Sequence, residues 1–356
     1  MACPETVPFA LAQLTEPQQY ASPTALPPGF HASIALLLGN CCNLTYTQLA
    51  NGTTTLSAAE LQGLGSGNTF KQLAGFTVSE SIVAGAEIGT SGEYVTVPVG
   101  FALSGAMTSG GPAMNIIALR GTQTYNEWIN DIDAVPTPFH VGNNNGHYYM
   151  NIEFAPLGLV HGSFYSLYNQ GTDGTQPTKI YHAMDLMTEY TRPPGSIAEQ
   201  IATLLTGATL DAALPLYITG HSLGGALAIL CAMDIGTNFP NGFPAGGLAM
   251  YNLAGPLVAA GLSAFNTSFL TIDPSVFVTA YTSAVANSYR IVNSPDIVPI
   301  SPPGCLGLGS ELSIQFAHVT ANPVAYCAQM GSIGANHSCS GTYVPYLQQL
   351  ANGFSG

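Results

Sequence analysis

Short β-prone runs alternate with helical patterns along most of the chain. Apolar spacing predicts a helix over residues 31–50 and antiparallel strands within 72–105. Further buried strands are predicted at the compact apolar runs 114–119, 216–219, 248–253 and 288–292. Further helices are predicted at 195–205 and 226–233. Strands that alternate with helices favour an α/β fold, with a mostly parallel central sheet and helices on both faces.

Two stretches lack such a pattern. Residues 1–30 are rich in Pro and polar residues, and we expect them to form an irregular N-terminal arm. Residues 300–330 are poorly patterned, and we expect them to be rich in loops. No repeat, long linker or composition break divides the remainder, so residues 31–356 are predicted to form one domain. The apolar run 248–265 is interrupted by Asn252 and Pro256, so it is read as strand and turn, and no transmembrane segment is expected.

Charged side chains are scarce and mostly negative. Asp and Glu total 19 while Lys and Arg total 5, which gives a net charge of −14. Nucleic acids and anionic membrane surfaces attract clustered Lys and Arg, so the composition argues against both as electrostatic partners. Any attraction to lipid has to come from apolar surface instead.

Cysteines, acidity and sequons favour an exported protein, with a cytoplasmic location as the alternative. The four Asn-x-Ser/Thr sequons lie at Asn43, Asn51, Asn266 and Asn336. Residues 1–20 lack the basic start and apolar block of a signal peptide. The spacing of the 7 cysteines matches no zinc site. Cys305, Cys327 and Cys339 fall within 35 residues, which suggests one disulfide among them.

The strongest chemical signal is the pentapeptide Gly220-His221-Ser222-Leu223-Gly224. It has the G-x-S-x-G form in which a serine occupies a sharp turn between a strand and a helix. A β-prone run precedes it and a run of helix formers follows it. Bulk at either glycine would clash with the neighbouring strand and helix. The pattern predicts that Ser222 is a nucleophile; the alternative is a serine in an ordinary Gly-rich turn.

A serine nucleophile needs a histidine base and an acid that orients the histidine. In α/β-hydrolases these follow the serine in the order acid, then histidine. The acidic residues after the serine are Asp234, Asp273, Asp296 and Glu311. Asp296 is favoured because it follows an apolar strand at the edge where active sites of open α/β sheets gather. His337, in a loop of small residues, is favoured over His318, whose apolar flanks are typical of a packed core histidine.

With these residues in place, the chain resembles the class 3 lipase family of fungal-type triacylglycerol lipases. Four sequence blocks, in the family's order, carry the resemblance. They are Ile117-Ala118-Leu119-Arg120-Gly121-Thr122 with Trp128 and Asp131, then Val160–Phe164, then Thr219–Ala228, then Tyr289–Asn293 with Asp296, Val298 and Pro299. In the second block the glycine stands one position earlier than in the family pattern. The resemblance covers roughly residues 31–350.

The resemblance implies an α/β-hydrolase fold with a triad of Ser222, Asp296 and His337. It also implies that Thr122 and the backbone N–H of Leu223 form the oxyanion hole. No metal or organic cofactor is implied. The acyl-enzyme route of such a triad hydrolyses carboxylic esters, and acylglycerols are the expected substrates.

The resemblance further implies a lid over residues 123–135. Tyr125, Trp128, Ile129 and Ile132 fall on one face of a helix there, and that face would meet a lipid–water interface. The alternative is a surface helix that packs this stripe on the core. We also expect an ion pair between Arg120 and Asp131 at the base of the lid.

Three other functions remain open at this point. The first is an esterase of short or aromatic acids, including feruloyl-type esters. The second is a phospholipase A1. The third, and the least favoured, is a catalytically silent α/β-hydrolase used for binding, because all three triad positions are present in the sequence.

Overall fold

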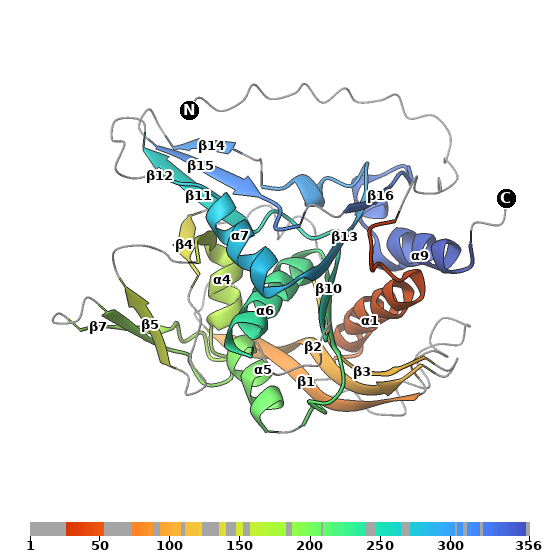
Figure 1. Cartoon of the computed structure of the whole chain (residues 1–356), viewed down its shortest axis with the longest axis horizontal. Coiled ribbons are helices and arrows are strands. Elements are labelled where there is room, and N and C mark those ends of the chain that lie inside the picture. Colours follow the sequence, from red (N-terminus) through yellow and green to blue (C-terminus); the bar gives the residue numbers. More distant parts are fainter. Residues whose placement is uncertain are drawn as a thin grey trace.

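A seven-stranded sheet runs through the centre of the computed structural model of this chain (Figure 1). The structure describes residues 26–52, 73, 75–87, 93–107, 111–122, 135–139, 147–151, 157–182, 187–207, 209–239, 247–264, 271–302, 305–308, 312–320 and 323–353. The strand order is β1-β2-β3-β9-β10-β13-β16. These strands are β1 (Phe76–Glu87), β2 (Tyr94–Ala106), β3 (Ala113–Leu119), β9 (Leu216–His221), β10 (Leu248–Leu253), β13 (Asn287–Asn293) and β16 (Pro323–Tyr326).

The central sheet is mostly parallel, as its continuous apolar runs predict. β3, β9, β10, β13 and β16 pair in parallel, while β1 and β2 form the antiparallel edge expected within 72–105. β3 is buried at every position after its first residue. Helices on both faces leave no solvent-facing side, so such a strand is mostly apolar, and Asn115 is the one polar residue of β3.

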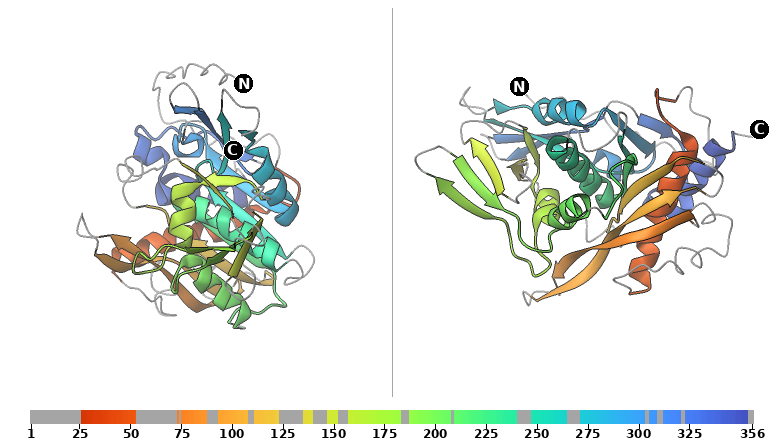
Figure 2. Two further views of the ribbon diagram at one scale, coloured as in Figure 1. Left: turned by 90° about the vertical axis from the view of Figure 1, so that its left-hand side faces the viewer. Right: turned by 60° about the horizontal axis from the view of Figure 1, so that its bottom comes forward.

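Helices cover both faces of this sheet (Figures 1 and 2). On one face lie α1 (Ala32–Ala50) and α9 (Val344–Ala351), and on the other lie α4 (Gly162–Asn169), α5 (Ile197–Thr206), α6 (Leu223–Asn238) and α7 (Ser275–Ala284). Successive residues of β3 enter opposite cores: Ile116 packs with the α1 side, and Ile117 packs with the α6 side. The period of two along the strand therefore divides one apolar run between two cores.

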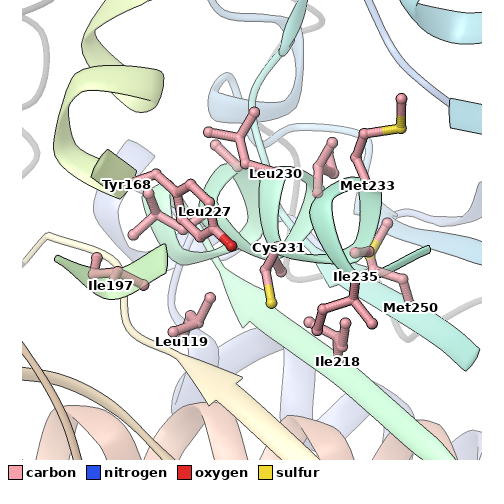
Figure 3. Close-up of a cluster of buried hydrophobic side chains, with 14 of the residues drawn as sticks. Leu119, Tyr168, Ile197, Ile218, Leu227, Leu230, Cys231, Met233, Ile235 and Met250 are labelled. Carbon is pink, nitrogen blue, oxygen red and sulfur yellow. The ribbon is translucent and has the colours of Figure 1, made fainter. Parts of the chain in front are cut away.

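The α6 core lies between that helix, β9 and the helices beside it (Figure 3). Leu227, Leu230 and Cys231 from α6 are buried there with Ile218 of β9. Nearly every residue of α6 is buried, which explains why its sequence is apolar all round rather than along one stripe. The predicted helices at 31–50, 195–205 and 226–233 correspond to α1, α5 and α6.

Two further sheets were not predicted. One contains β14 (Cys305–Leu308), β15 (Leu312–Ala317), β11 (Ala259–Ala264), β6 (Leu159–His161) and β4 (Pro136–Pro138), with β12 (Thr271–Ile272) paired to β11. The other is a three-stranded sheet of β5 (His147–Asn151), β8 (Met187–Thr191) and β7 (Thr178–His182).

The expectation of a loop-rich 300–330 segment is wrong. β14 and β15 pair antiparallel with each other, β15 pairs with β11, and β16 extends the central sheet beside β13. These strands are only four to six residues long. Such short strands give too few alternating positions for a periodic signal, and long-range pairing stabilises them instead.

The suggestion of a disulfide among the three C-terminal cysteines is also wrong. Cys327 and Cys339 are both free thiols, so no pair among the three can form. Cys339 is buried with its Sγ 3.9 Å from the carbonyl oxygen of Gly39 in α1. The thiol therefore packs between helices as a small apolar group.

Two other expectations concern the N-terminal arm and the absence of a transmembrane segment. Residues 1–25, most of the predicted N-terminal arm, lie outside the described residues. Residues 26–30 lie against the sheet, where Phe30 is buried and meets the ring of Tyr289 edge-on. The division at residue 30 stays a prediction. Among the described helices, none combines the length and the apolarity needed to cross a bilayer.

Candidate active site

Ser222 occupies a strained turn between β9 and α6. Its backbone angles are φ 61° and ψ −130°, which L-residues rarely adopt. The Ser222 N–H donates to the carbonyl oxygen of Leu253 at 3.0 Å, which ties the turn to β10. A Cβ added to Gly220 would collide with the backbone of Gly224, and one added to Gly224 would collide with the carbonyl of Leu119. The sterics predicted for the two glycines are confirmed.

Asp296 lies beyond the end of β13, at the same edge of the sheet as the serine turn. β9, β10 and β13 are parallel neighbours, so the segments that follow them leave the sheet on the same side. The Asp296 N–H donates to the carbonyl oxygen of Asn293 at 2.9 Å and closes a tight turn. Asp296 is only 2% exposed, so protein groups rather than water have to stabilise the charge of its carboxylate.

Three groups hold the Asp296 carboxylate. Oδ2 lies 2.7 Å from Nδ1 of His337 and accepts a hydrogen bond from the hydroxyl of Tyr343, also at 2.7 Å. Oδ1 accepts from the backbone N–H of Val298 at 3.0 Å. His337 follows the short helix α8 (Ile333–Asn336), and Tyr343 ends the π-helix η3 (Cys339–Tyr343). The carboxylate therefore fixes the imidazole by its Nδ1 and leaves Nε2 for another partner.

The histidine that precedes Ser222 forms a second link to His337. Tyr46 of α1 lies with its hydroxyl 2.8 Å from Nδ1 of His221, and Nε2 of His221 lies 2.8 Å from the backbone carbonyl oxygen of His337. Burial lowers the pKa of His221 well below its usual range, and the nearby His337 lowers it further. His221 is therefore neutral near pH 7, and both of its ring nitrogens are engaged.

Ser222 and His337 line one cavity of about 320 Å³. Thr122, Tyr46 and His221 line it too. Leu223 begins α6 immediately after the serine. The structure thus brings Ser222, His337 and Thr122 to one cavity, with Asp296 behind the imidazole. Within the described residues, no three His, Cys, Asp or Glu side chains are grouped so as to hold a metal ion.

The acidic and histidine residues set aside from the sequence lie elsewhere. Asp234 in α6 is paired with Arg192, and Asp273 accepts the N–H of Ser275 at the start of α7. His318 follows β15 in a mostly buried position. Burial and the charge of Arg290 lower its pKa to about 3. His318 is thus a packed histidine, as its apolar flanks indicate, and Asp234 and Asp273 have structural contacts away from Ser222.

The structure does not test the predicted lid or the predicted ion pair at its base. Tyr125, Trp128, Ile129, Ile132 and Asp131 fall outside the described residues. The Arg120 guanidinium donates to two backbone carbonyl oxygens, of Pro98 at 3.0 Å and of Gly121 at 2.6 Å. These bonds hold the strand end that leads into Thr122.

Sequence reasoning missed Tyr343, Tyr46 and Asn43, all of which lie at this site. Tyr343 bonds Asp296, while Tyr46 and Asn43 reach the cavity from α1. A tyrosine in an amphipathic segment far from any motif carries no local signal of such a role. His221 directly precedes Ser222 in the sequence, and this position was the one available hint of a supporting role.

The chain is similar to known lipases in sequence and in structure. A model of the family described as lipase (class 3) matches residues 116–305, which is more than half of the chain. Phospholipase A1-II 6 of Oryza sativa subsp. japonica is 29% identical over 208 residues, which cover 56% of this chain and 43% of that protein. The chain thus spans about half the length of the curated relatives it matches.

Two solved structures of lipases are similar to this chain at low sequence identity. A triacylglycerol lipase described as having a serine protease triad at its catalytic centre is 16% identical, with a TM-score of 0.47 and coverage of 85% of this chain and 90% of that one. A Rhizomucor miehei lipase in complex with its propeptide is 18% identical, with a TM-score of 0.44 and coverage of 92% and 83%. Because the family model matches more than half of the chain, including β9, β10 and β13, the chain belongs to the class 3 lipase family and has the α/β-hydrolase fold.

Proposed function

We propose that this protein is a serine carboxylic-ester hydrolase, and that it acts as a lipase on acylglycerols. The observation that carries the proposal is the 2.7 Å contact between His337 Nδ1 and Asp296 Oδ2, made at a cavity that Ser222 also lines. This leaves the imidazole Nε2 for the serine side of the cavity. Membership of the class 3 lipase family supports the same chemistry.

In the proposed mechanism, Ser222 attacks the ester carbonyl while His337 takes the serine proton. Asp296 keeps the imidazole in the tautomer that accepts at Nε2, and it stabilises the imidazolium that forms. The tetrahedral intermediate collapses, the acyl–oxygen bond breaks, and His337 gives its proton to the leaving alcohol. Water, activated by the same imidazole, then releases the acid and restores Ser222.

We assign the oxyanion hole to Thr122 and the N–H of Leu223. Two features support this assignment. Thr122 lines the cavity with Ser222, and Leu223 is the first residue of α6, whose N-terminal dipole favours a developing negative charge. Removal of one such donor costs roughly 3 kcal/mol in other hydrolases, so Thr122→Val is expected to lower kcat by about a hundredfold.

We also propose that residues 123–135 form a lid that meets the lipid–water interface. Thr122 lines the cavity, so the segment that follows it starts at the site. Trp128, in the apolar stripe, is the only tryptophan of the chain. Its emission therefore reports on the lid alone. A blue shift with neutral lipid micelles, and quenching by brominated lipid, are expected; an unchanged spectrum would argue for a helix fixed on the core.

The enzyme proposal is tested by covalent labelling and by chain length. An organophosphonate is expected to add once, at Ser222, and not to the folded Ser222→Ala variant. Among p-nitrophenyl esters, medium and long acyl chains should be preferred, with a jump in rate on emulsified substrate. A folded protein without a Ser222 adduct would favour a binding role. A maximum at acetate without an interfacial jump would favour an esterase.

The second candidate is a phospholipase A1. The names of the rice relatives, which are 26–29% identical to this chain, favour it. Release of the acyl group from position one of phosphatidylcholine in mixed micelles measures it. A rate above that on the matched diacylglycerol would make phospholipid the preferred substrate.

We propose, finally, that the protein is exported. In the structure, two of the four sequons contain a buried residue that glycosylation would need to reach. Thr45 of the Asn43 sequon is buried in α1 with its hydroxyl on a backbone carbonyl, and Asn336 is itself buried. Asn51, exposed at the end of α1, is the accessible site among the described ones. Expression in a eukaryotic secretory host is expected to give a glycan at Asn51, seen as a mass shift that Asn51→Gln removes.

A further inference from the structure

Residues 329–336, the base segment, lead to His337 and have little apolar packing. Residues 330–334 are all exposed to solvent. Asn336 is the one buried residue of the base segment, at 5% exposure. Hydrophobic burial therefore contributes little to the position of this segment, and polar contacts have to fix it.

The side chain of Asn336 joins the two turns that carry the proposed acid and base. Its Nδ2 donates to the carbonyl oxygen of Pro295 at 3.3 Å, and Pro295 directly precedes Asp296. Its Oδ1 accepts from the backbone N–H of Met330 at 2.7 Å, within the exposed stretch. A backbone carbonyl only accepts and a backbone N–H only donates, so these two partners fix which way the amide points. Asn336 itself directly precedes His337.

A second buried amide holds the same segment from the central sheet. Asn293 is the last residue of β13 and is fully buried. Its Nδ2 lies 3.0 Å from the carbonyl oxygens of both Ala328 and Asn336, and its Oδ1 accepts from the N–H of Ala328 at 2.8 Å. Asn293 thus connects the sheet to both ends of the base segment.

These hydrogen bonds bear directly on the contact between acid and base. Pro295 and Asn336 are each one residue away from a member of the proposed pair, whose side chains meet at 2.7 Å. A bond of that length to a carboxylate is charge-assisted and depends on close approach. A displacement of one turn against the other by about 1 Å would break it, and misplacement of that size can cost about a hundredfold in rate.

We propose that Asn336 is a positioning residue, which keeps Asp296 and His337 at bonding distance by tying the base segment to the turn of the acid. The inference rests on the proposed function, because it gives Asn336 a part in the chemistry of that pair. From the sequence, Asn336 stood out only as part of a sequon. It is not among the described residues that line the cavity beside Ser222, so its substitution should change kcat and leave KM almost unchanged.

Asn336→Ala removes both side-chain hydrogen bonds and leaves the proposed triad in place. On a soluble p-nitrophenyl ester, kcat is expected to fall about tenfold to a hundredfold, while KM stays within about twofold. The rate of phosphonate labelling at Ser222 should fall in parallel, because labelling depends on the same serine and histidine. Asn336→Ser, whose short side chain cannot span the two partners, is expected to give the same pattern and serves where the alanine variant does not fold.

Asn115→Ala is the matched control. Asn115 is also a buried asparagine: its Nδ2 donates to the carbonyl oxygen of Asp211 at 2.8 Å, and its Oδ1 accepts from the hydroxyl of Ser104 at 2.9 Å. It pairs with the start of β9, whereas Ser222 follows the end of that strand. Both alanine variants are expected to lower the urea midpoint of unfolding, and only Asn336→Ala should lower kcat.

A second readout does not depend on turnover. The proton between His337 Nδ1 and Asp296 Oδ2 is expected to give a far-downfield NMR resonance, because the two atoms are 2.7 Å apart and the acceptor is charged. Asp296→Asn identifies this resonance by removing it. The resonance should move upfield or broaden in Asn336→Ala and stay in place in Asn115→Ala.

The outcomes separate this inference from the proposed function. Equal kcat values in folded Asn336→Ala and Asn115→Ala overturn the inference and leave the ester hydrolase intact. A higher KM with an unchanged kcat also overturns it, because a positioning residue acts on the chemical step. A folded, unsubstituted protein that hydrolyses no soluble ester and takes no phosphonate at Ser222 overturns the proposed function, and the inference with it.

Discussion

The backbone carbonyl of His337 lies 2.8 Å from Nε2 of His221, the residue immediately before Ser222. A carbonyl oxygen only accepts, so Nε2 of His221 carries the proton, and Nδ1 accepts from the hydroxyl of Tyr46. His337 is thus held twice, by Asp296 at its ring and by His221 at its main chain. The geometry makes His221 a positioning residue for the proposed base.

Loss of this link is expected to slow the enzyme without unfolding it. His221→Leu leaves the hydroxyl of Tyr46 and the carbonyl of His337 unpaired, so kcat on a soluble ester should fall roughly tenfold to a hundredfold. Tyr46→Phe removes only the hydrogen bond from the tyrosine hydroxyl to His221, so its kcat should fall less. Steady-state kinetics, with circular dichroism as the check on folding, measures both. An unchanged kcat in folded His221→Leu would remove the positioning role.

Tyr343 is expected to matter through Asp296. Its hydroxyl donates to Oδ2 at 2.7 Å, the same oxygen that faces His337. Tyr343→Phe removes a hydrogen bond to a buried charge, which costs about 1.5–3 kcal/mol, so kcat should fall about tenfold or more. Tyr346→Phe is the matched control, because Tyr346 instead stacks on Tyr326. Equal kinetics of the two variants would show that Tyr343 does not support the carboxylate.

The Arg192–Asp234 pair is expected to stabilise the fold and not the chemistry. Nη2 of Arg192 lies 2.7 Å from both carboxylate oxygens of Asp234, and the hydroxyl of Tyr168 donates to one of them at 3.0 Å. Arg192→Leu leaves a buried carboxylate uncompensated, so the free energy of unfolding should drop by about 3–5 kcal/mol. Urea unfolding measures it, with Arg192→Lys as the milder variant. Phosphonate labelling of the folded fraction should stay unchanged, and a drop below about 1 kcal/mol would contradict the assignment.

Acid should destabilise the protein through its buried histidines. Burial, with the charge of Arg290, lowers the pKa of His318 to about 3, and burial lowers that of His221 well below its usual range. The unfolded chain therefore binds protons below about pH 6.5 that the folded chain does not, so stability falls as pH drops from there toward about 3. Each histidine contributes a slope of up to about 1.4 kcal/mol per pH unit. Urea unfolding between about pH 7 and 4 tests this. His318→Gln should flatten the slope, and an equal slope in that variant would contradict the argument.

The sequence predicted the parts of this molecule that carry strong local patterns. Ser222 stands in a strand–turn–helix motif, Asp296 follows a buried strand, and β3, β9, β10 and β13 fall in compact apolar runs. The turn glycines proved necessary for steric reasons that the motif itself states. Each of these features depends on neighbours in the chain, which is why they could be recognised one by one.

The parts that were missed depend on distant residues. β14 and β15 are short and become strands by pairing with each other and with β11. Tyr46 acts on His221, which lies 175 positions further along the chain, so neither sequence context hints at the other. Cys339 looked like a disulfide partner by spacing, yet it packs against α1 as a thiol. Spacing along the chain does not report such contacts.

The central claim is that Ser222 and His337 act as one catalytic unit oriented by Asp296. Its most direct test is a double-mutant comparison of kcat on a soluble ester with Ser222→Ala, His337→Ala and the variant that carries both. Residues that act together lose nearly everything at the first substitution. We predict that each single variant loses about a factor of a million and that the double variant loses no more. Losses that multiply in the double variant, or a His337→Ala enzyme that keeps its rate, would contradict the account.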